Sequence, residues 1–297
     1  VLVEEGTGTW CGWCPRGAVA MDKYNDIYND LFVPVALHGG SSAEPMRLVE
    51  YDLFLNFTSF PGAKVDRGDF IDPGDSEAPF LTNITKAPLA KLESGARLNE
   101  ADNILDISVD VEFLDKAAGN FYVSMILTED DVKGTSSGYA QANYYSGGGA
   151  GQMGGYEILP NPVPASKMVY NHVARAVSGL NSSTANSITG NSFTAGNKSV
   201  VYFSIKLDPK WKKDKMHIIP VILRNGIVVN VNTSTIEEAI NYGYVVGTSE
   251  VELSSRLNIY PNPFTNGVSI ESINPIKQII LYDVTGRSIV NRNYEEG

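Results

Sequence analysis

The sequence predicts an α/β domain over residues 1–97, an antiparallel β-sandwich domain over residues 98–247, and a small β module over residues 256–297. In the first segment, short apolar runs alternate with stretches of helical spacing, which is typical of a sheet covered by helices. From Asn99 onward, apolar and polar residues alternate with a period of two, as in antiparallel strands. A linker-like stretch, Gly247–Ser255, separates the last module, which has few residues for a core.

The first domain is expected to alternate strands and helices, in the order strand Val1–Glu5, helix Pro15–Asp30, strand Phe32–Leu37, helix Met46–Phe57, strand Ala63–Asp66 and helix Ser76–Leu98. Pro15 suits the first turn of a helix, where its missing N–H would have no partner. The Phe32–Leu37 run is apolar, which is typical of a strand buried on both faces. Pro79 and Pro88 are expected to interrupt the last helix.

The second domain is expected to consist of strands at Leu105–Phe113, Phe121–Leu127 and Val200–Leu207, and of a hairpin at Met216–Asn232. Asn225-Gly226 marks the hairpin turn, because both residues tolerate a positive φ. Short antiparallel strands of this kind commonly pack as a sandwich. The Gly-rich run Ser146–Gly155 cannot form a core and predicts a mobile surface loop.

The chain is acidic, since 34 Asp and Glu residues against 23 Lys and Arg residues give a formal net charge of -11. The only dense basic run, Lys210–Lys215, is interrupted by Trp211 and Asp214 and indicates a solvated turn. We therefore expect no nucleic-acid partner. No apolar run approaches the roughly 18 residues that a membrane helix needs. A peripheral or anchored association with a membrane stays open.

The chain has only two cysteines, Cys11 and Cys14, and both lie in the motif Trp-Cys-Gly-Trp-Cys-Pro between a predicted strand and a predicted helix. The N-terminus of a helix at Cys11 supplies N–H groups and a positive dipole, which lower the pKa of a thiol. Cys14, one turn later, is placed to resolve a mixed disulfide. We therefore predict Cys11 as the nucleophile and Cys14 as the resolving thiol. Trp10, Gly12 and Trp13 are expected to contact the substrate.

Two other uses of the cysteine pair are considered. Structural zinc takes four Cys or His ligands, but there is no second Cys-x-x-Cys pair and His38, His172 and His217 are scattered. We therefore predict no zinc site, and no cofactor. Copper handling stays open as an alternative, because two thiolates and His38 could hold a soft metal. A surface binding protein with a static Cys11–Cys14 disulfide stays open as well.

The motif Trp-Cys-Gly-Trp-Cys-Pro after a strand resembles the thioredoxin superfamily. This resemblance implies a thioredoxin-like fold for residues 1–97, and a buried acid six residues before the first cysteine that helps to move the proton of the resolving thiol. Glu5 holds that position, with Glu4 as the alternative, and burial would raise the pKa of such a carboxyl. The cis-proline of the superfamily corresponds to Pro61. It would leave the backbone of Phe60 exposed to pair with an extended substrate.

A closer resemblance covers more of the chain. Residues 1–17 are similar to the outer membrane protein twenty-eight family of Bacteroidetes, and Phe60–Arg67 and Tyr170–Ala176 look like later parts of that family. The resemblance implies a thioredoxin-like N-terminal domain, a following β-domain and a location in the cell envelope. Gly6 stands where an aromatic residue is expected, which loosens the match.

The C-terminal module resembles a type IX secretion C-terminal sorting domain at two places, Leu257–Phe264 and Ile280–Arg287. Its residues predict turns between short strands at Leu257–Tyr260, Val268–Ile270 and Gln278–Tyr282. The resemblance implies export across the outer membrane by the type IX secretion machinery, followed by release or anchoring at the surface. The last strand and the basic end of such a domain are missing, so we expect a partial one.

These observations predict a thiol–disulfide oxidoreductase of the cell envelope, at the outer membrane surface or secreted. Its partners would be protein thiols or disulfides. The mechanism would be attack by Cys11 on a substrate disulfide and resolution by Cys14.

Overall fold

The computed structural model describes residues 1–245, 258–260, 269–271, 276, 278–282 and 288–293. The chain forms two compact units, Val1–Val245 and Val246–Gly297. The second unit contains two antiparallel pairs, namely β15 (Asn258–Tyr260) with β16 (Ser269–Glu271) and β17 (Gln278–Tyr282) with β18 (Ser288–Asn293). The strands β15, β16 and β17 match the three predicted strands. Leu257, Val268 and the predicted linker Gly247–Ser255 lie outside the described residues.

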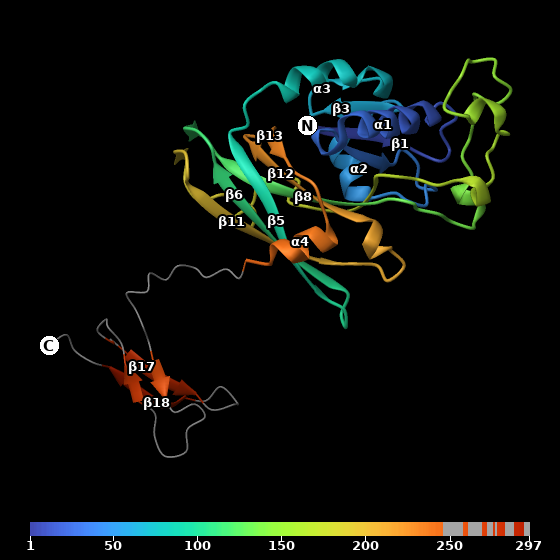
Figure 1. Ribbon diagram of the computed structural model, residues 1–297. Coiled ribbons are helices and arrows are strands. Elements are labelled where there is room, and N and C mark those ends of the chain that lie inside the picture. Colours follow the sequence, from blue (N-terminus) through green and yellow to red (C-terminus); the bar gives the residue numbers. More distant parts are fainter. Residues whose placement is uncertain (246–257, 261–268, 272–275, 277, 283–287, 294–297) are drawn as a thin grey trace. The chain divides into compact units, whose positions relative to one another are not determined.

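Nine strands of the first unit form one mixed sheet, in the order β13-β12-β8-β9-β2-β1-β3-β4, with β14 paired to β12 (Figure 1). Their bounds are β1 Leu2–Thr7, β2 Val33–His38, β3 Gly62–Val65, β4 Phe70–Ile71, β8 Phe121–Glu129, β9 Val173–Ser178, β12 Met216–Arg224, β13 Ile227–Val231 and β14 Ser234–Thr235. The strand β2 runs parallel to both β1 and β9. The other neighbours in this sheet are antiparallel.

Helices cover both faces of the part of the sheet that contains β1 and β2. They are α1 (Pro15–Tyr28), α2 (Val49–Leu55) and α3 (Glu77–Ile84). Successive side chains of a strand point to opposite faces. Leu2 accordingly joins the apolar cluster that contains Tyr51 of α2. Val3 joins the cluster that contains Met21 of α1 and Phe80 of α3, so α1 and α3 lie on the face opposite to α2.

The predicted fold class, a thioredoxin-like α/β domain followed by a separate antiparallel β-sandwich, is wrong. The strands β8, β9, β12 and β13 of the second segment continue the sheet that β1 and β2 begin. At the junction Ala36 of β2 pairs with Val173 of β9, and the Ala36 N–H donates to the carbonyl of His172 at 2.7 Å. An edge strand exposes unpaired backbone groups, and β9 pairs with β2 at this register position. The result is a large mixed sheet with few helices.

Sandwich-like packing is nevertheless present in the first unit. A second sheet has the order β11-β6-β5 and contains β5 Ala90–Asn99, β6 Ile104–Phe113 and β11 Lys198–Lys206. Its inner residues, such as Ile107 and Val109, share one apolar cluster with Val123 of β8 and Ile218 of β12. Two antiparallel layers therefore enclose a common core. The domain boundaries 1–97 and 98–247 stay a prediction about which segments fold independently.

Smaller elements complete the first unit. They are α4 (Ile236–Tyr242), the pair β7 (Ala117–Ala118) with β10 (Ser192–Phe193), and 3₁₀ turns at Asn29–Leu31, Pro73–Asp75, Ser137–Tyr139, Tyr156–Ile158, Ala165–Lys167 and Lys213–Lys215. The predicted helix Ser76–Leu98 is wrong in its second half, because β5 begins at Ala90. Ala90, Leu92 and Ser94 are buried at a spacing of two, which is the period of a strand.

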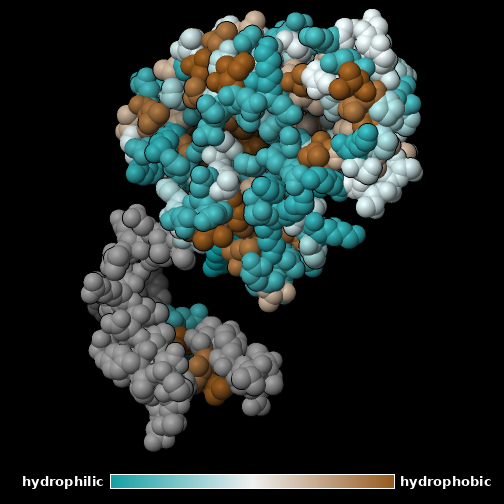
Figure 2. All heavy atoms as spheres, turned by 45° about the vertical axis from the view of Figure 1, so that its right-hand side comes forward, coloured by the Kyte–Doolittle hydropathy of each residue, from teal (hydrophilic) through white to brown (hydrophobic). Residues whose placement is uncertain are grey.

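The surface of the first unit is mainly polar on the face that Figure 2 presents. Apolar residues lie there in separate groups, with hydrophilic residues between them. None of the described helices is both long and apolar enough to cross a membrane.

Candidate functional site

The cysteine pair lies between β1 and α1, as the sequence predicts. Cys11 and Cys14 form a disulfide, with their Cα atoms 5.3 Å apart. Cys14 is the N-cap residue of α1, and its carbonyl accepts hydrogen bonds from the N–H groups of Gly17 and Ala18. The Cys11 N–H donates to the carbonyl of Gly8 at 3.1 Å. The pair therefore occupies a tight turn at the positive end of a helix.

Aromatic rings surround this turn. The Trp10 and Phe60 ring centroids are 5.3 Å apart, and the Trp10 indole donates from Nε1 to the carbonyl of Gly39 at 2.9 Å. On the other side of the motif, Trp13 meets the ring of Tyr144 edge-on at 5.4 Å. These rings are the predicted substrate contacts, except for Tyr144, which the sequence analysis missed.

Gly12 and the Phe60-Pro61 bond also lie where the sequence places them. A Cβ atom on Gly12 would come within 2.5 Å of the Tyr144 ring, so glycine is needed for this close approach. The peptide bond between Phe60 and Pro61 is cis. Pro61 lies near Gly17 in the first turn of α1, since a Cβ atom on Gly17 would be 3.4 Å from the Pro61 Cβ.

Glu5 is buried directly beneath the first turn of α1. A Cβ atom on Gly17 would be 1.9 Å from Oε1 of Glu5, which shows how closely the carboxyl approaches the helix. This oxygen has no hydrogen-bond partner. Burial raises the pKa of Glu5 to about 8, and the charges of Asp22 and Asp72 add to the rise while the Thr7 hydroxyl opposes it. The carboxyl therefore keeps its proton to a higher pH than an ordinary glutamate does.

Glu4, the alternative acid, points away from the cysteine pair. It accepts hydrogen bonds from the Tyr51 hydroxyl and from Nε of Arg67, the latter at 3.1 Å. Tyr51 belongs to α2, on the face of the sheet opposite to α1. Adjacent strand residues face opposite ways, so Glu4 and Glu5 cannot both reach the motif.

A cavity of about 140 Å³ is lined by both Glu5 and Cys14. Its wall includes Glu5, Cys14, Asp22, His38, Tyr156 and His172. A water molecule occupies about 30 Å³ in the liquid, so the cavity has room for several waters. A proton could move between Cys14 and Glu5 through such waters.

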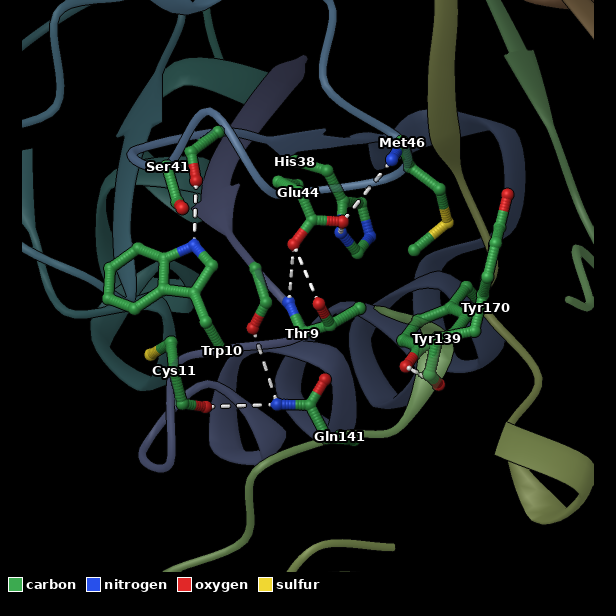
Figure 3. A network of polar contacts seen from close by, with 12 residues as sticks. Thr9, Trp10, Cys11, His38, Ser41, Glu44, Met46, Tyr139, Gln141 and Tyr170 are labelled. Carbon is green, nitrogen blue, oxygen red and sulfur yellow. Dashed lines mark hydrogen bonds and ion pairs between the residues drawn. The ribbon is translucent and has the colours of Figure 1, made fainter. Parts of the chain in front are cut away.

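A buried polar network fixes the loop before the motif (Figure 3). Glu44 accepts hydrogen bonds from the Thr9 N–H at 2.7 Å and from the Thr9 hydroxyl at 2.9 Å. Its other oxygen lies 3.1 Å from Nδ1 of His38 and 3.3 Å from the Met46 N–H that donates to it. Burial opposes the charge of Glu44, but the hydrogen bonds from His38 and Thr9 outweigh it and lower the pKa of this carboxyl.

A segment far along the chain, residues 141–145, crosses the motif; we name it the strap. The Gln141 amide donates from Nε2 to the carbonyl of Cys11 at 2.9 Å and to that of Gly8 at 3.3 Å (Figure 3). The Ala142 N–H donates to Thr9, and the Tyr144 N–H donates to Gly12 at 2.9 Å. No local sequence pattern predicts the strap, because Gln141 and Cys11 are 130 positions apart.

The strap is itself held by Asn143, whose side chain is fully buried. The Asn143 amide donates from Nδ2 to the carbonyl of Tyr156 at 2.8 Å, and its backbone N–H donates to the Asn161 side chain at 2.9 Å. The Gly-rich run Ser146–Gly155 is therefore flanked by anchored residues. Within this run, a Cβ atom added to Gly147 would have no atom within 4 Å apart from those of Gly147 and its chain neighbours.

The three histidines are paired with carboxylates. His172 lies 3.3 Å from Asp22 through Nε2 and 3.3 Å from Asp130 through Nδ1, and His217 lies 3.0 Å from Asp130. Nδ1 of His38 faces Glu44. Within the part of the chain that the structure describes, no group of three or more His, Cys, Asp or Glu residues is arranged to hold a metal ion.

Residues 258–297 match the secretion system C-terminal sorting domain. The predicted export signal is thereby confirmed. The protein is secreted to the cell surface or the outer membrane, and the type IX secretion machinery takes part. The match covers the C-terminal module alone, so a thioredoxin-like family is not shown for the rest of the chain.

Other comparisons give no further assignment. No curated protein matches the chain. Protein AGR_C_4864 of Agrobacterium tumefaciens is similar in structure with 12% identity, a TM-score of 0.49, and coverage of 79% of this chain and 93% of its own. The sporulation control protein Spo0M of Bacillus subtilis has 12% identity, a TM-score of 0.29, and coverage of 58% of both chains. Both TM-scores lie below 0.5, and the relationship to the outer membrane protein twenty-eight family stays a prediction.

Proposed function

We propose that the protein carries out thiol–disulfide exchange through Cys11 and Cys14 on protein thiols or disulfides at the cell surface. The observation that carries the proposal is the cavity shared by Glu5 and Cys14. Glu5 has a raised pKa of about 8 and an oxygen without a hydrogen-bond partner, so it can accept or return a proton. A disulfide with a purely structural role needs no such acid beside it.

The protein's dithiol is oxidised when it reduces a substrate disulfide. The Cys11 thiolate attacks a substrate disulfide, a mixed disulfide forms, and the first substrate sulfur leaves as a thiolate. The ionised form of Glu5 then takes the proton of Cys14, and Cys14 attacks the sulfur of Cys11. The Cys11–Cys14 bond forms, and the second substrate sulfur leaves as a thiolate. The substrate thiolates take two protons from solvent, and Glu5 returns its proton through the cavity.

The aromatic surroundings support a polypeptide substrate. Neither the N–H nor the C=O of Phe60 makes a hydrogen bond with a described residue. Both groups are therefore free to pair with an extended substrate as an added strand. Trp10, Gly12 and Trp13 would contact the residues around the substrate sulfur, in the roles that the sequence suggests.

The proposal is tested by equilibrating the full chain in graded glutathione or dithiothreitol buffers and trapping free thiols. A reversible two-electron transition between about -120 and -270 mV is expected, which is the range of working oxidoreductases. The Cys14→Ser variant should accumulate a mixed disulfide at Cys11, because resolution is blocked. Thiols that never pair would contradict the proposal.

The second candidate function is a surface binding protein with a static disulfide. The observation in its favour is burial, because Cys11 and Cys14 are both buried in the folded chain. A static disulfide should have a reduction potential below about -300 mV. The same titration therefore separates the two candidates.

A further inference from the structure

The nucleophilic sulfur lies below a rim of larger side chains. Cys11 is 5% exposed. Trp10, Trp13 and Tyr144 are 45%, 43% and 56% exposed. Phe60 completes the rim beside Trp10. A surface that approaches the motif therefore meets aromatic rings before it meets sulfur.

The strap makes this rim a fixed structure. The hydrogen bonds from Ala142 and Tyr144 to the loop around the motif hold the strap at a set distance from Cys11. Gln141 adds a bond to the carbonyl of Cys11 itself. The buried Asn143 anchors the strap from behind. The ring of Tyr144 therefore stays beside Gly12 and Trp13, where it forms one wall of the rim.

We infer that the site selects a disulfide carried by an extended polypeptide segment and excludes one that lies in a folded surface, and that Tyr144 sets this selectivity. The inference rests on the proposed thiol–disulfide exchange and names the substrate class for it. The covalent steps are unchanged, since Cys11 attacks one substrate sulfur and the other leaves as a thiolate.

The physical reason is the short distance that attack requires. Reacting atoms must approach to about 3–3.5 Å before a bond can form. A folded surface is broad and rests on Trp13 and Tyr144 before its sulfur comes that close. An extended segment is one residue wide, so it can enter between these rings and the pair formed by Trp10 and Phe60. The free backbone groups of Phe60 can then hold it.

The rim also indicates the residues that flank the substrate cysteine. It presents aromatic rings and no charged side chain. Arg16, the first charged residue after the motif, is paired with Asp72, with Nη2 and Oδ2 2.6 Å apart. Apolar or aromatic neighbours of the substrate cysteine therefore fit the rim best.

The test uses the reduced full chain and three probes that release coloured thionitrobenzoate on exchange. The first is a peptide of about ten residues, long enough to add as a strand, with a mixed disulfide on one cysteine between aromatic residues. The second carries the same mixed disulfide on the exposed face of a helix in a folded domain. The third is the free disulfide of thionitrobenzoate, which reports intrinsic reactivity.

The peptide should react at least about tenfold faster than the folded probe. Tyr144→Ala should reduce this ratio at least about threefold by speeding the folded probe relative to the free disulfide. Tyr144→Phe, which keeps the ring, should preserve the ratio. Tyr202→Ala is the matched control, because Tyr202 is an exposed tyrosine of the second sheet.

Equal rates for the peptide and the folded probe in the unmodified chain would overturn the inference. So would a ratio that Tyr144→Ala leaves unchanged. In both cases the proposed exchange reaction would stand, since the probes still react. If none of the three probes reacts, the proposed function fails, and the inference fails with it.

Discussion

Two adjacent acids of β1 have opposite electrostatic environments at the scale of single residues. Glu4 is buried beside the Arg67 guanidinium and the Tyr51 hydroxyl, which satisfy its charge. Glu5 is buried without a cation, and one of its oxygens has no partner. A buried carboxyl of that kind favours its neutral form. The strand period alone decides which acid lies under the cysteines.

Replacing Glu5 with Gln should change how stability depends on pH. Because the pKa of Glu5 is about 8 in the folded chain and near 4.5 in the unfolded one, the unfolded state loses its proton first. Stability of the unmodified chain therefore falls between pH 4.5 and 8, by up to about 1.4 kcal/mol per pH unit relative to Glu5→Gln. Guanidinium unfolding of both proteins, with the disulfide intact, measures the difference. Parallel pH profiles would mean that Glu5 is already ionised at neutral pH.

Glu44 should show the opposite dependence. Its pKa is lowered in the folded chain, so its contribution is present above the unfolded pKa and is lost as the pH falls. Glu44→Gln removes the negative charge that Thr9 and His38 stabilise through hydrogen bonds. The substitution should lower the free energy of unfolding by about 1–3 kcal/mol at pH 7. The difference from the unmodified chain should shrink as the pH falls below about 4.5. Glu50→Gln, at an exposed position of α2, is the control and should change little.

At the scale of elements, the strap shows how a loop becomes part of a site. Its hydrogen bonds run to the motif on one side and to residues 156–163 on the other. The Gly-rich run between these anchors makes few contacts of its own. The strap is therefore held by side-chain and backbone hydrogen bonds to neighbouring loops rather than by regular secondary structure.

Asn143→Ala should release the strap without unfolding the sheet. It removes a buried amide that bonds the carbonyls of Tyr156 and Leu159 and leaves these groups without a donor. Hydrogen exchange of residues 139–163 should become faster, and protease cleavage within Gly147–Gly151 should increase. Gln152→Ala is the control, because Gln152 is exposed in the same segment. Unchanged exchange in Asn143→Ala would mean that the strap is held by its backbone alone.

At the scale of the whole first unit, the sheet joins the two segments that the sequence divides at residue 97. The strand β9 lies between β2 and β8. The core of the second sheet includes side chains of β8 and β12, which belong to the large sheet. Loss of either half would expose apolar surface of the other, so the halves should unfold together.

Tryptophan fluorescence can test this coupling, because the three tryptophans divide between the two halves. Trp10 and Trp13 lie at the motif, and Trp211 packs against the core of the second sheet. Variants of the full chain that retain only Trp13 or only Trp211 should unfold at the same guanidinium midpoint. Two separate midpoints would instead show that residues 1–97 unfold on their own, as the predicted domain boundary suggests.

The structural elements that the sequence predicts correctly depend on local patterns of neighbouring residues. The apolar run of β2, Pro15 at the start of α1 and the Asn225-Gly226 turn between β12 and β13 each need only a few neighbouring residues. The pairing of β9 with β2 could not be predicted in this way, because it joins Ala36 to Val173. The strap was missed for the same reason. Glu5 was located by its spacing from Cys11, but only the register of β1 separates it from Glu4.

The distance along the chain between Cys11 and its partners ties the chemistry of the motif to the timing of folding. The Gln141 side chain donates a hydrogen bond to the carbonyl of Cys11, which lies 130 positions earlier in the chain. The strand β2 pairs with β9 through Val173, which is also far along the chain. Contacts of such long range form late, since a large loop must close first. Before these contacts form, Cys11 and Cys14 lack the hydrogen bond from Gln141 and the neighbouring sheet that surround them in the folded chain. The environment of the motif is therefore complete only when the whole first unit has folded.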